Sequence, residues 1–90
     1  MNDKLFKTNQ FKRSYKKLQL TDSQDQAFID VVYKLLNSVV LDKKYSDHFL
    51  KGDYSGFKEC HIKPDLLLIY KIEDDVLKLV DIGSHSDLFD

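Results

Sequence analysis

Three apolar runs separated by very short breaks constrain the fold of this chain more than any other feature. The runs FKECHI (57–62), LLLIYKI (66–72) and VLKLVDI (76–82) have the length and composition of β-strands. Only residues 63–65 and 73–75 separate one run from the next. Breaks this short allow hairpins, so the three strands are expected to pair antiparallel. Pro64 has no N–H to donate to a strand ladder and therefore marks a turn.

The first half of the sequence predicts two helices. Phe11, Tyr15 and Leu18 recur at helical spacing, which indicates a helix over about 9–18. Thr21 and Gln24 fit a capping box, and the second helix is expected over about 22–37. Its apolar stripe consists of Phe28, Val31, Val32, Leu35 and Leu36.

Together these elements predict an α+β fold. A helical hairpin would pack on one face of a mostly antiparallel four-stranded sheet, whose first strand is a very short one at Leu5 and Phe6. The middle run, LLLIY, is apolar at every position. The sheet face away from the helices is therefore either partly covered or a working surface.

Bulk composition predicts one soluble domain over residues 1–90. No apolar run approaches the ~18 residues of a membrane span, and the N-terminus lacks the apolar stretch of a signal peptide. A single cysteine, Cys60, cannot form an internal disulfide, so a reducing cytoplasm is expected. Residues 1–20 carry a net charge of +5 within a chain of net −1. This asymmetry indicates either an anionic partner or a solvated helix face.

The three histidines lie outside the predicted helices. His61 ends the first long strand, just before the turn that contains Asp65, and His85 follows the last strand. Because the third strand runs back towards the first turn, His85 is expected to arrive at the same end of the sheet as His61 and Asp65. His48 lies in the preceding loop, and the pattern alone does not place it.

Two histidines and a carboxylate at one sheet end suit proton transfer near neutral pH. Lys51, Lys58 and Lys63 would hold a phosphate, so the set fits cleavage of an RNA backbone by its own 2′-hydroxyl without a metal. Each histidine has an ordinary structural alternative, and the cluster has a metal-binding one, although no HExxH or CxxC motif is present. Cys60 is expected to be a buried filler, and Phe89 either a core residue or a platform for a base.

Three stretches resemble the YafQ family within the RelE superfamily of bacterial toxin–antitoxin toxins. They are YSDHFLKGDYSGFKECH (45–61), HIKPDLLLIY (61–70) and IGSHSDLF (82–89). They occur in the family's order and at its separation, and they cover about half of the chain. The first half is similar to the family only in outline, as two helices.

The resemblance implies a RelE-like fold and an endoribonuclease that cuts messenger RNA on the ribosome without a metal or other cofactor. It also implies a bacterial cytoplasmic location and a cognate antitoxin of the DNA-binding ribbon-helix-helix type. By analogy, His85 would be the general acid, and His48 or His61 would activate the 2′-hydroxyl. Asp65 would orient a histidine, and Phe89 would position a base.

The sequence departs from the family pattern at two positions, and the superfamily fold allows one competing function. Lys58 and Asp81 stand where many relatives carry arginine, and lysine lacks the bidentate fork that arginine offers to phosphate. The superfamily fold also includes ParE-like gyrase inhibitors and members that only bind an antitoxin. The histidine trio favours the nuclease, since a gyrase-binding surface has no need of it.

Overall fold

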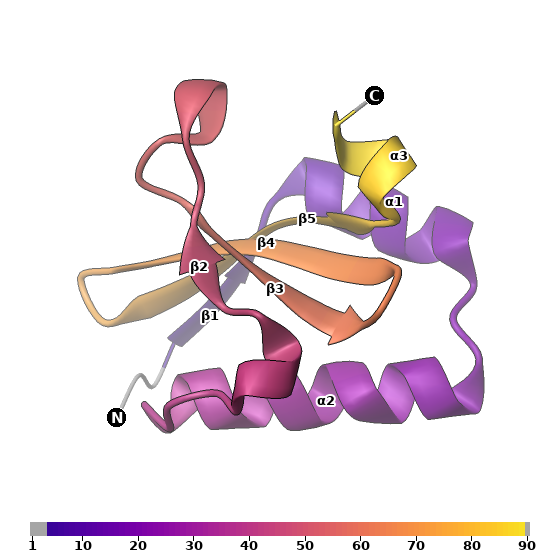
Figure 1. Ribbon diagram of the computed structural model, residues 1–90, viewed down its shortest axis with the longest axis horizontal. Helices are drawn as coiled ribbons and strands as arrows, with labels where there is room; N and C mark the ends of the chain where they lie inside the picture. Colours follow the sequence, from indigo (N-terminus) through magenta and orange to yellow (C-terminus); the bar gives the residue numbers. More distant parts are fainter. Residues whose placement is uncertain (1–3, 90) are drawn as a thin grey trace.

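A five-stranded sheet with the order β1-β5-β4-β3-β2 forms the centre of the fold (Figure 1). The computed structural model describes residues 4–89. The strands are β1 (Lys4–Lys7), β2 (His48–Phe49), β3 (Lys58–Lys63), β4 (Leu66–Glu73) and β5 (Val76–Gly83). The helices are α1 (Asn9–Leu18), α2 (Asp22–Leu36) and α3 (His85–Phe89), with 3-10 turns η1 (Lys43–Tyr45) and η2 (Gly52–Tyr54).

The strand pairing confirms the hairpin prediction. β4 pairs antiparallel with β3 on one side and with β5 on the other, and β1 adds a parallel strand beside β5. The fold class is therefore as predicted, but the sheet has five strands where four were expected. The fifth, β2, pairs antiparallel with the start of β3 over two residues, which is too short a stretch to leave a periodic signal in the sequence.

Both long helices begin where the sequence provides a cap. The Thr8 side chain accepts a hydrogen bond from the Phe11 amide at the start of α1, and Thr21 and Gln24 form the predicted capping box of α2. The rings of Phe11, Tyr15 and Phe28 join the two helices, with centroids 5.3–5.9 Å apart. These contacts fix the helices as one layer on the sheet.

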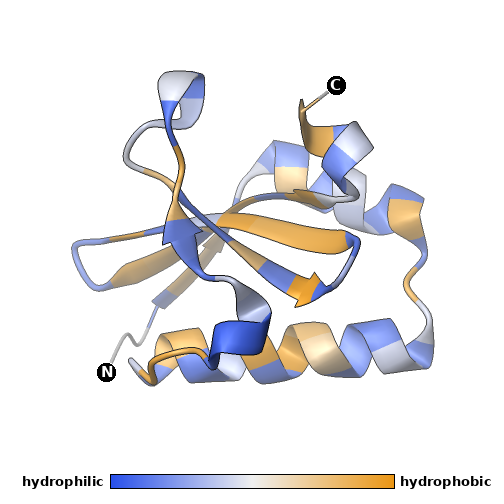
Figure 2. Ribbon diagram, viewed as in Figure 1, coloured by the Kyte–Doolittle hydropathy of each residue, from blue (hydrophilic) through white to orange (hydrophobic). Residues whose placement is uncertain are grey.

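β4 is buried on both of its faces. Leu66, Leu68 and Tyr70 belong to the core shared with the helices, whereas Leu67 and Ile69 alternate to the other face and are only 2% and 0% exposed. Figure 2 shows hydrophobic colouring along much of β4 and hydrophilic colouring at the hairpin turns. In Figure 1, α2 runs along one side of the sheet, while α3 and the loop around η2 stand on the other. The second face is thus partly covered.

Within residues 4–89, no helix is both long and apolar enough to cross a membrane.

The burial of Cys60 gives a testable property of the fold. The side chain is 0% exposed, and burial raises the pKa of its thiol to about 12. We expect the folded protein to resist alkylation by iodoacetamide at mildly alkaline pH and the guanidinium-unfolded chain to react fully. Mass spectrometry of both samples measures this, and rapid labelling of the folded protein would contradict the packing described here.

Candidate active site

Sheet register brings His61, Asp65 and His85 to one end of the molecule. His61 lies opposite Leu67 on β4, and Leu67 lies opposite Gly83 on β5. α3 begins two residues later at His85. The backbone N–H of His85 donates a hydrogen bond of 3.2 Å to Oδ1 of Asp65, which lies in the β3–β4 turn. Asp65 therefore fixes the segment that carries His85 through its backbone, where an imidazole contact was expected.

A local capping arrangement sets the start of α3. The Ser84 hydroxyl accepts from the Asp87 amide at 3.1 Å, and Asp87 Oδ2 accepts from the Ser84 amide at 3.0 Å. These hydrogen bonds hold the pKa of the Asp87 carboxyl below its ordinary value. A Cβ atom on Gly83 would lie 2.9 Å from Cβ of Asp87. The glycine of the Gly-Ser-His sequence thus leaves the room that the Asp87 side chain occupies.

A buried carboxylate that the sequence interpretation did not single out joins the two remaining histidines. Oε1 of Glu59 lies 3.5 Å from Nε2 of His48 and 3.4 Å from Nε2 of His61. Glu59 is only 5% exposed, whereas His48 is exposed and His61 half-buried. Part of this cluster could have been predicted from the sequence, because Glu59 and His61 are two residues apart on one strand and therefore share a face. The pairing of His48 with Glu59 depends on the short strand β2.

Asp47 fastens the loop that carries His48. Its carboxylate accepts a hydrogen bond from the Tyr70 hydroxyl and lies 2.8 Å from Nζ of Lys58. Burial and this hydrogen bond raise the pKa of Tyr70. Lys58 lies opposite Tyr70, so it shares the helix-side face and lies on the other face from Glu59 and His61. The structure therefore separates Lys58 from the histidines and pairs its charge with Asp47.

The other residues named from the sequence have different surroundings. Lys51 is exposed at the start of η2. The Phe89 ring lies 5.2 Å from the ring of His85 and 6.1 Å from that of Tyr54, so it links α3 to the η2 loop while staying 37% exposed. Asp81, the second departure from the family, is buried.

The carboxylate of Asp81 is used inside the protein. It accepts hydrogen bonds from the Gln10 side chain at 2.6 Å and from the Ile82 amide at 2.8 Å. Both oxygens are thereby satisfied within the fold, so this carboxylate is not presented to a phosphate on the surface.

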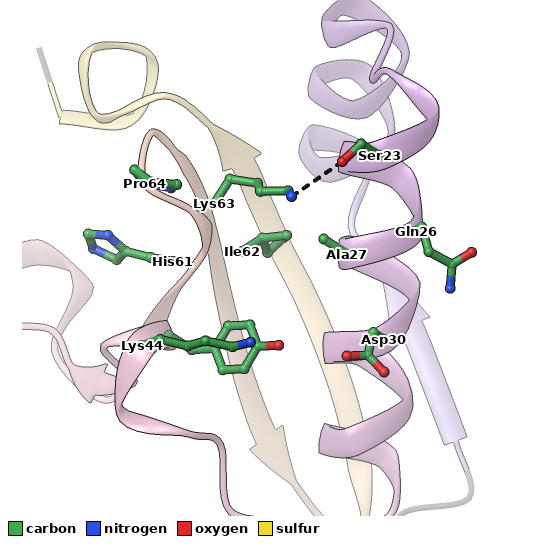
Figure 3. A pocket seen from close by; sticks show the side chains of 10 residues that line it. Ser23, Gln26, Ala27, Asp30, Lys44, His61, Ile62, Lys63 and Pro64 are labelled. Atoms are coloured by element: carbon green, nitrogen blue, oxygen red, sulfur yellow. Dashed lines mark hydrogen bonds between the residues drawn. The ribbon is translucent and has the colours of Figure 1, made fainter.

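A cavity of about 810 Å³ lies beside this cluster and not within it (Figure 3). α2, η1 and the end of β3 line it, and Nζ of Lys63 donates a hydrogen bond of 3.3 Å to the Ser23 hydroxyl across its wall. Of the four predicted catalytic residues, only His61 lines the cavity, and its ring points away from α2. Within residues 4–89, no group of three histidine, cysteine or acidic side chains is arranged to hold a metal ion.

Comparison with known proteins identifies the family. A family model described as "Bacterial toxin of type II toxin-antitoxin system, YafQ" matches residues 3–90. The chain belongs to the YafQ toxin family. The mRNA interferase toxin YafQ of Escherichia coli (strain K12) is 40% identical over 53 residues, which are 59% of this chain and 58% of that relative.

Solved structures of bacterial toxins share the fold over nearly the whole chain. A copper-bound mutant toxin from Helicobacter pylori is 40% identical with a TM-score of 0.86, covering 96% of this chain and 98% of that one. YafQ in the DinJ–YafQ complex of Escherichia coli is 28% identical with a TM-score of 0.82, covering 96% and 97%. The fold and family predictions are thus confirmed.

The close approach at Gly83 predicts a local effect of substitution. Gly83→Ala should displace Asp87 and weaken the cap of α3, because the added methyl group overlaps the Asp87 side chain. The amide of Leu88, which donates to the Ser84 carbonyl, should then exchange roughly 2–30-fold faster, the range implied by loss of a helix cap. Hydrogen exchange followed by NMR tests this, with the buried Leu68 amide as internal control. Unchanged exchange at Leu88 would contradict the role assigned to Gly83.

Proposed function

We propose that this protein is the toxin of a type II toxin–antitoxin pair and a ribosome-dependent, metal-independent endoribonuclease that cleaves messenger RNA. The observations that support the proposal are the contacts of His48 and His61 with the buried Glu59, and the hydrogen bond that ties the backbone of His85 to Asp65 at the end of the sheet. Membership of a family that includes an mRNA interferase of Escherichia coli supports the choice of substrate.

The proposed reaction uses the RNA's own 2′-hydroxyl as nucleophile. His48 or His61 accepts the proton of that hydroxyl, and the 2′-oxygen forms a bond to the adjacent phosphorus. The bond from phosphorus to the 5′-oxygen of the next nucleotide breaks, and His85 donates a proton to that oxygen. The products are a 2′,3′-cyclic phosphate and a 5′-hydroxyl, and no water is consumed in this step.

The surrounding residues would position the RNA. Asp65 holds the backbone at His85, and the half-exposed Phe89 ring beside His85 offers a surface for a base. Lys51 is exposed and free to approach a phosphate. Lys58 is paired with Asp47 on the other sheet face, so we assign it to fastening the His48 loop and not to the substrate.

The competing function is binding without catalysis, either as a gyrase inhibitor or as an antitoxin-binding protein only. Such a protein would leave RNA intact whatever happens to its histidines. A metal-dependent nuclease would differ in another way, because a metal-activated water leaves a 5′-phosphate in the usual case.

Substitution of His85 separates these functions. Removing the acid should slow cleavage roughly 10²–10⁴-fold, the usual contribution of one acid–base group. His85 is exposed, so His85→Ala and His85→Gln should fold normally, and Val40→Ala, which alters a 93% exposed side chain in the loop after α2, provides a control. Mapping cut sites and analysing the RNA ends in a translation reaction measures the effect.

Several outcomes of that experiment decide against the proposal. Full cleavage by His85→Ala would remove the role of His85. Ends carrying a 5′-phosphate, or loss of the chemical step with EDTA in an assay that does not itself need magnesium, would remove the metal-independent mechanism. Intact RNA with the wild-type protein would favour the binding function.

A cognate antitoxin is the expected partner. YafQ of Escherichia coli has been solved in a DinJ–YafQ toxin–antitoxin complex, which supports an antitoxin as the neutralising partner here. We expect that antitoxin to be a small DNA-binding protein of the ribbon-helix-helix type. Expression of the protein alone should arrest growth, and co-expression of the antitoxin should restore it. His85→Ala should lose toxicity and still be retained by the tagged antitoxin. Normal growth with abundant soluble wild-type protein would contradict the toxin function.

A further inference from the structure

We propose that Tyr54, Phe57 and Lys71 form a second RNA contact, which binds the nucleotides on the 3′ side of the cut. The inference rests on the proposed ribonuclease function and deepens it, because that function assigns only Phe89 to a base. Two features carry it: a run of aromatic rings that begins at the proposed acid His85, and the lysine at the far end of that run.

Four rings form a continuous run from the short helix α3 to the residue before β3. The ring centroids of His85 and Phe89 are 5.2 Å apart, and those of Phe89 and Tyr54 are 6.1 Å apart. The Tyr54 ring lies 6.3 Å from the ring of Phe57. In Figure 1, α3 and the loop around η2 stand on the same side of the sheet, away from α2. The run of rings therefore joins two segments that are far apart in the sequence.

The geometry of these contacts leaves aromatic surface for other groups. The ring planes of Tyr54 and Phe57 are inclined at 81°, and those of Tyr54 and Phe89 at 84°. Each contact thus sets the edge of one ring against the face of the other and covers only one face of the pair. Phe89 is 37% exposed, and Tyr54 and Phe57 are half-buried. Bases of single-stranded RNA stack on such rings whatever their sequence.

Phe57 and Lys71 lie on the same sheet face as the histidine cluster. Lys71 follows the core residue Tyr70 on β4, so its side chain points to the other face, together with Ile69. Nζ of Lys71 lies 5.1 Å from the centroid of the Phe57 ring, which places that ring on the same face. His61 follows Phe57 by four residues, or about 13 Å at the rise of a strand. The run of rings and the candidate active site therefore share one surface.

The charges beside Phe57 leave a cation for a phosphate. The Glu73 carboxylate lies 3.3 Å from Nζ of Lys71 and 2.9 Å from Nζ of Lys78. Two ammonium groups share one carboxylate, so the three side chains together are positively charged. Ion pairs at the surface contribute little stability, and a phosphate can therefore replace Glu73 at Lys71. A ring that stacks on a base beside a cation that holds the backbone is the combination by which proteins bind single-stranded RNA.

The position of the run relative to His85 indicates which side of the cut it serves. In the proposed reaction, His85 donates a proton to the 5′-oxygen, which belongs to the nucleotide on the 3′ side of the cut. Phe89 lies on the same helix as His85, and Tyr54 and Phe57 continue the run away from it. The leaving nucleotide is thus the one nearest the rings, and the nucleotides after it follow them towards Lys71.

Binding of an RNA that cannot be cleaved tests this contact independently of activity. The probe is a single-stranded 2′-O-methyl hexanucleotide of mixed sequence, because methylation removes the nucleophile. NMR of carbon-13-labelled protein should show the ring signals of Tyr54 and Phe57 shifted upfield, with nuclear Overhauser contacts to base protons. Phe49 is the control ring, since it lies 5.1 Å from Nζ of Lys58 on the other sheet face. The absence of base contacts at Tyr54 and Phe57 would overturn the proposal.

Substitutions distinguish stacking from packing of the loop. Tyr54→Leu keeps an apolar side chain and should weaken hexanucleotide binding roughly 5–150-fold, the range for loss of one base–aromatic stack. Tyr54→Phe keeps the ring and should bind as the wild type does, and so should the control Phe49→Leu. Fluorescence anisotropy of a labelled hexanucleotide measures the affinities. Equal affinity of the wild type and Tyr54→Leu would contradict the stacking role.

Salt dependence of the same binding tests the phosphate contact. Lys71→Gln should make the slope of log K against log salt concentration shallower by roughly 0.7, the value for one phosphate contact to a single strand. Lys34→Gln is the control, because Lys34 on α2 has a ring, Tyr45, at 5.3 Å and a carboxylate, Asp30, at 3.2 Å. Both lysine side chains are 32% exposed. Equal changes of slope in the two variants would contradict a phosphate site at Lys71.

Cleavage of shortened messages tests the direction of the RNA. In a translation reaction, the wild type should cleave a message that ends one nucleotide after the cut more slowly than a longer one. Tyr54→Leu should cleave both at the same reduced rate, because shortening and substitution remove one contact and their effects do not add. A shortening effect that persists in Tyr54→Leu would overturn the assignment to the 3′ side. If the wild type cleaves no RNA, the proposed function fails, while the hexanucleotide measurements still decide the RNA contact.

Discussion

The register of β4 between β3 and β5 is the constraint on which the rest of the structure depends. β4 is buried on both faces, so a shift of one residue would move Leu66, Leu68 and Tyr70 out of the helix-side core. The same register sets His61, Leu67 and Gly83 in one row across three strands. Packing energy that stabilises the fold thus also fixes how the two chain segments carrying His61 and His85 meet.

β3 divides its side chains between the core and the candidate site. Cys60 and Ile62 pack under the helices, and the alternate residues Glu59 and His61 face the other way. Burying a carboxylate opposes folding unless it is paired. Glu59 therefore stabilises the folded state less than an apolar residue at the same position would. Its contacts with two histidines offer a functional reason for its presence that core packing does not.

The sequence predicted the elements that rest on local signals. The capping box at Thr21 and the turn at Pro64 mark a helix start and a strand end in any context, and the hairpin argument correctly brought Asp65 to the segment of His85. Glu59 and Asp47 were missed for a physical reason. Their partners lie across strands or across the β2 loop, and a strand of two residues has no periodicity from which such pairs can be read.

The two departures from arginine change the electrostatics of the site less than their charges suggest. Lys58 is paired with Asp47, and Asp81 is buried against Gln10, so neither charge faces the histidine cluster. The exposed cations that remain include Lys51 and the α1 residues Lys12, Arg13, Lys16 and Lys17. A chain of net charge −1 gains little from long-range attraction to RNA. Phosphate recognition in this protein would therefore depend on cations close to the histidine cluster, such as Lys51, which follows His48 by three residues.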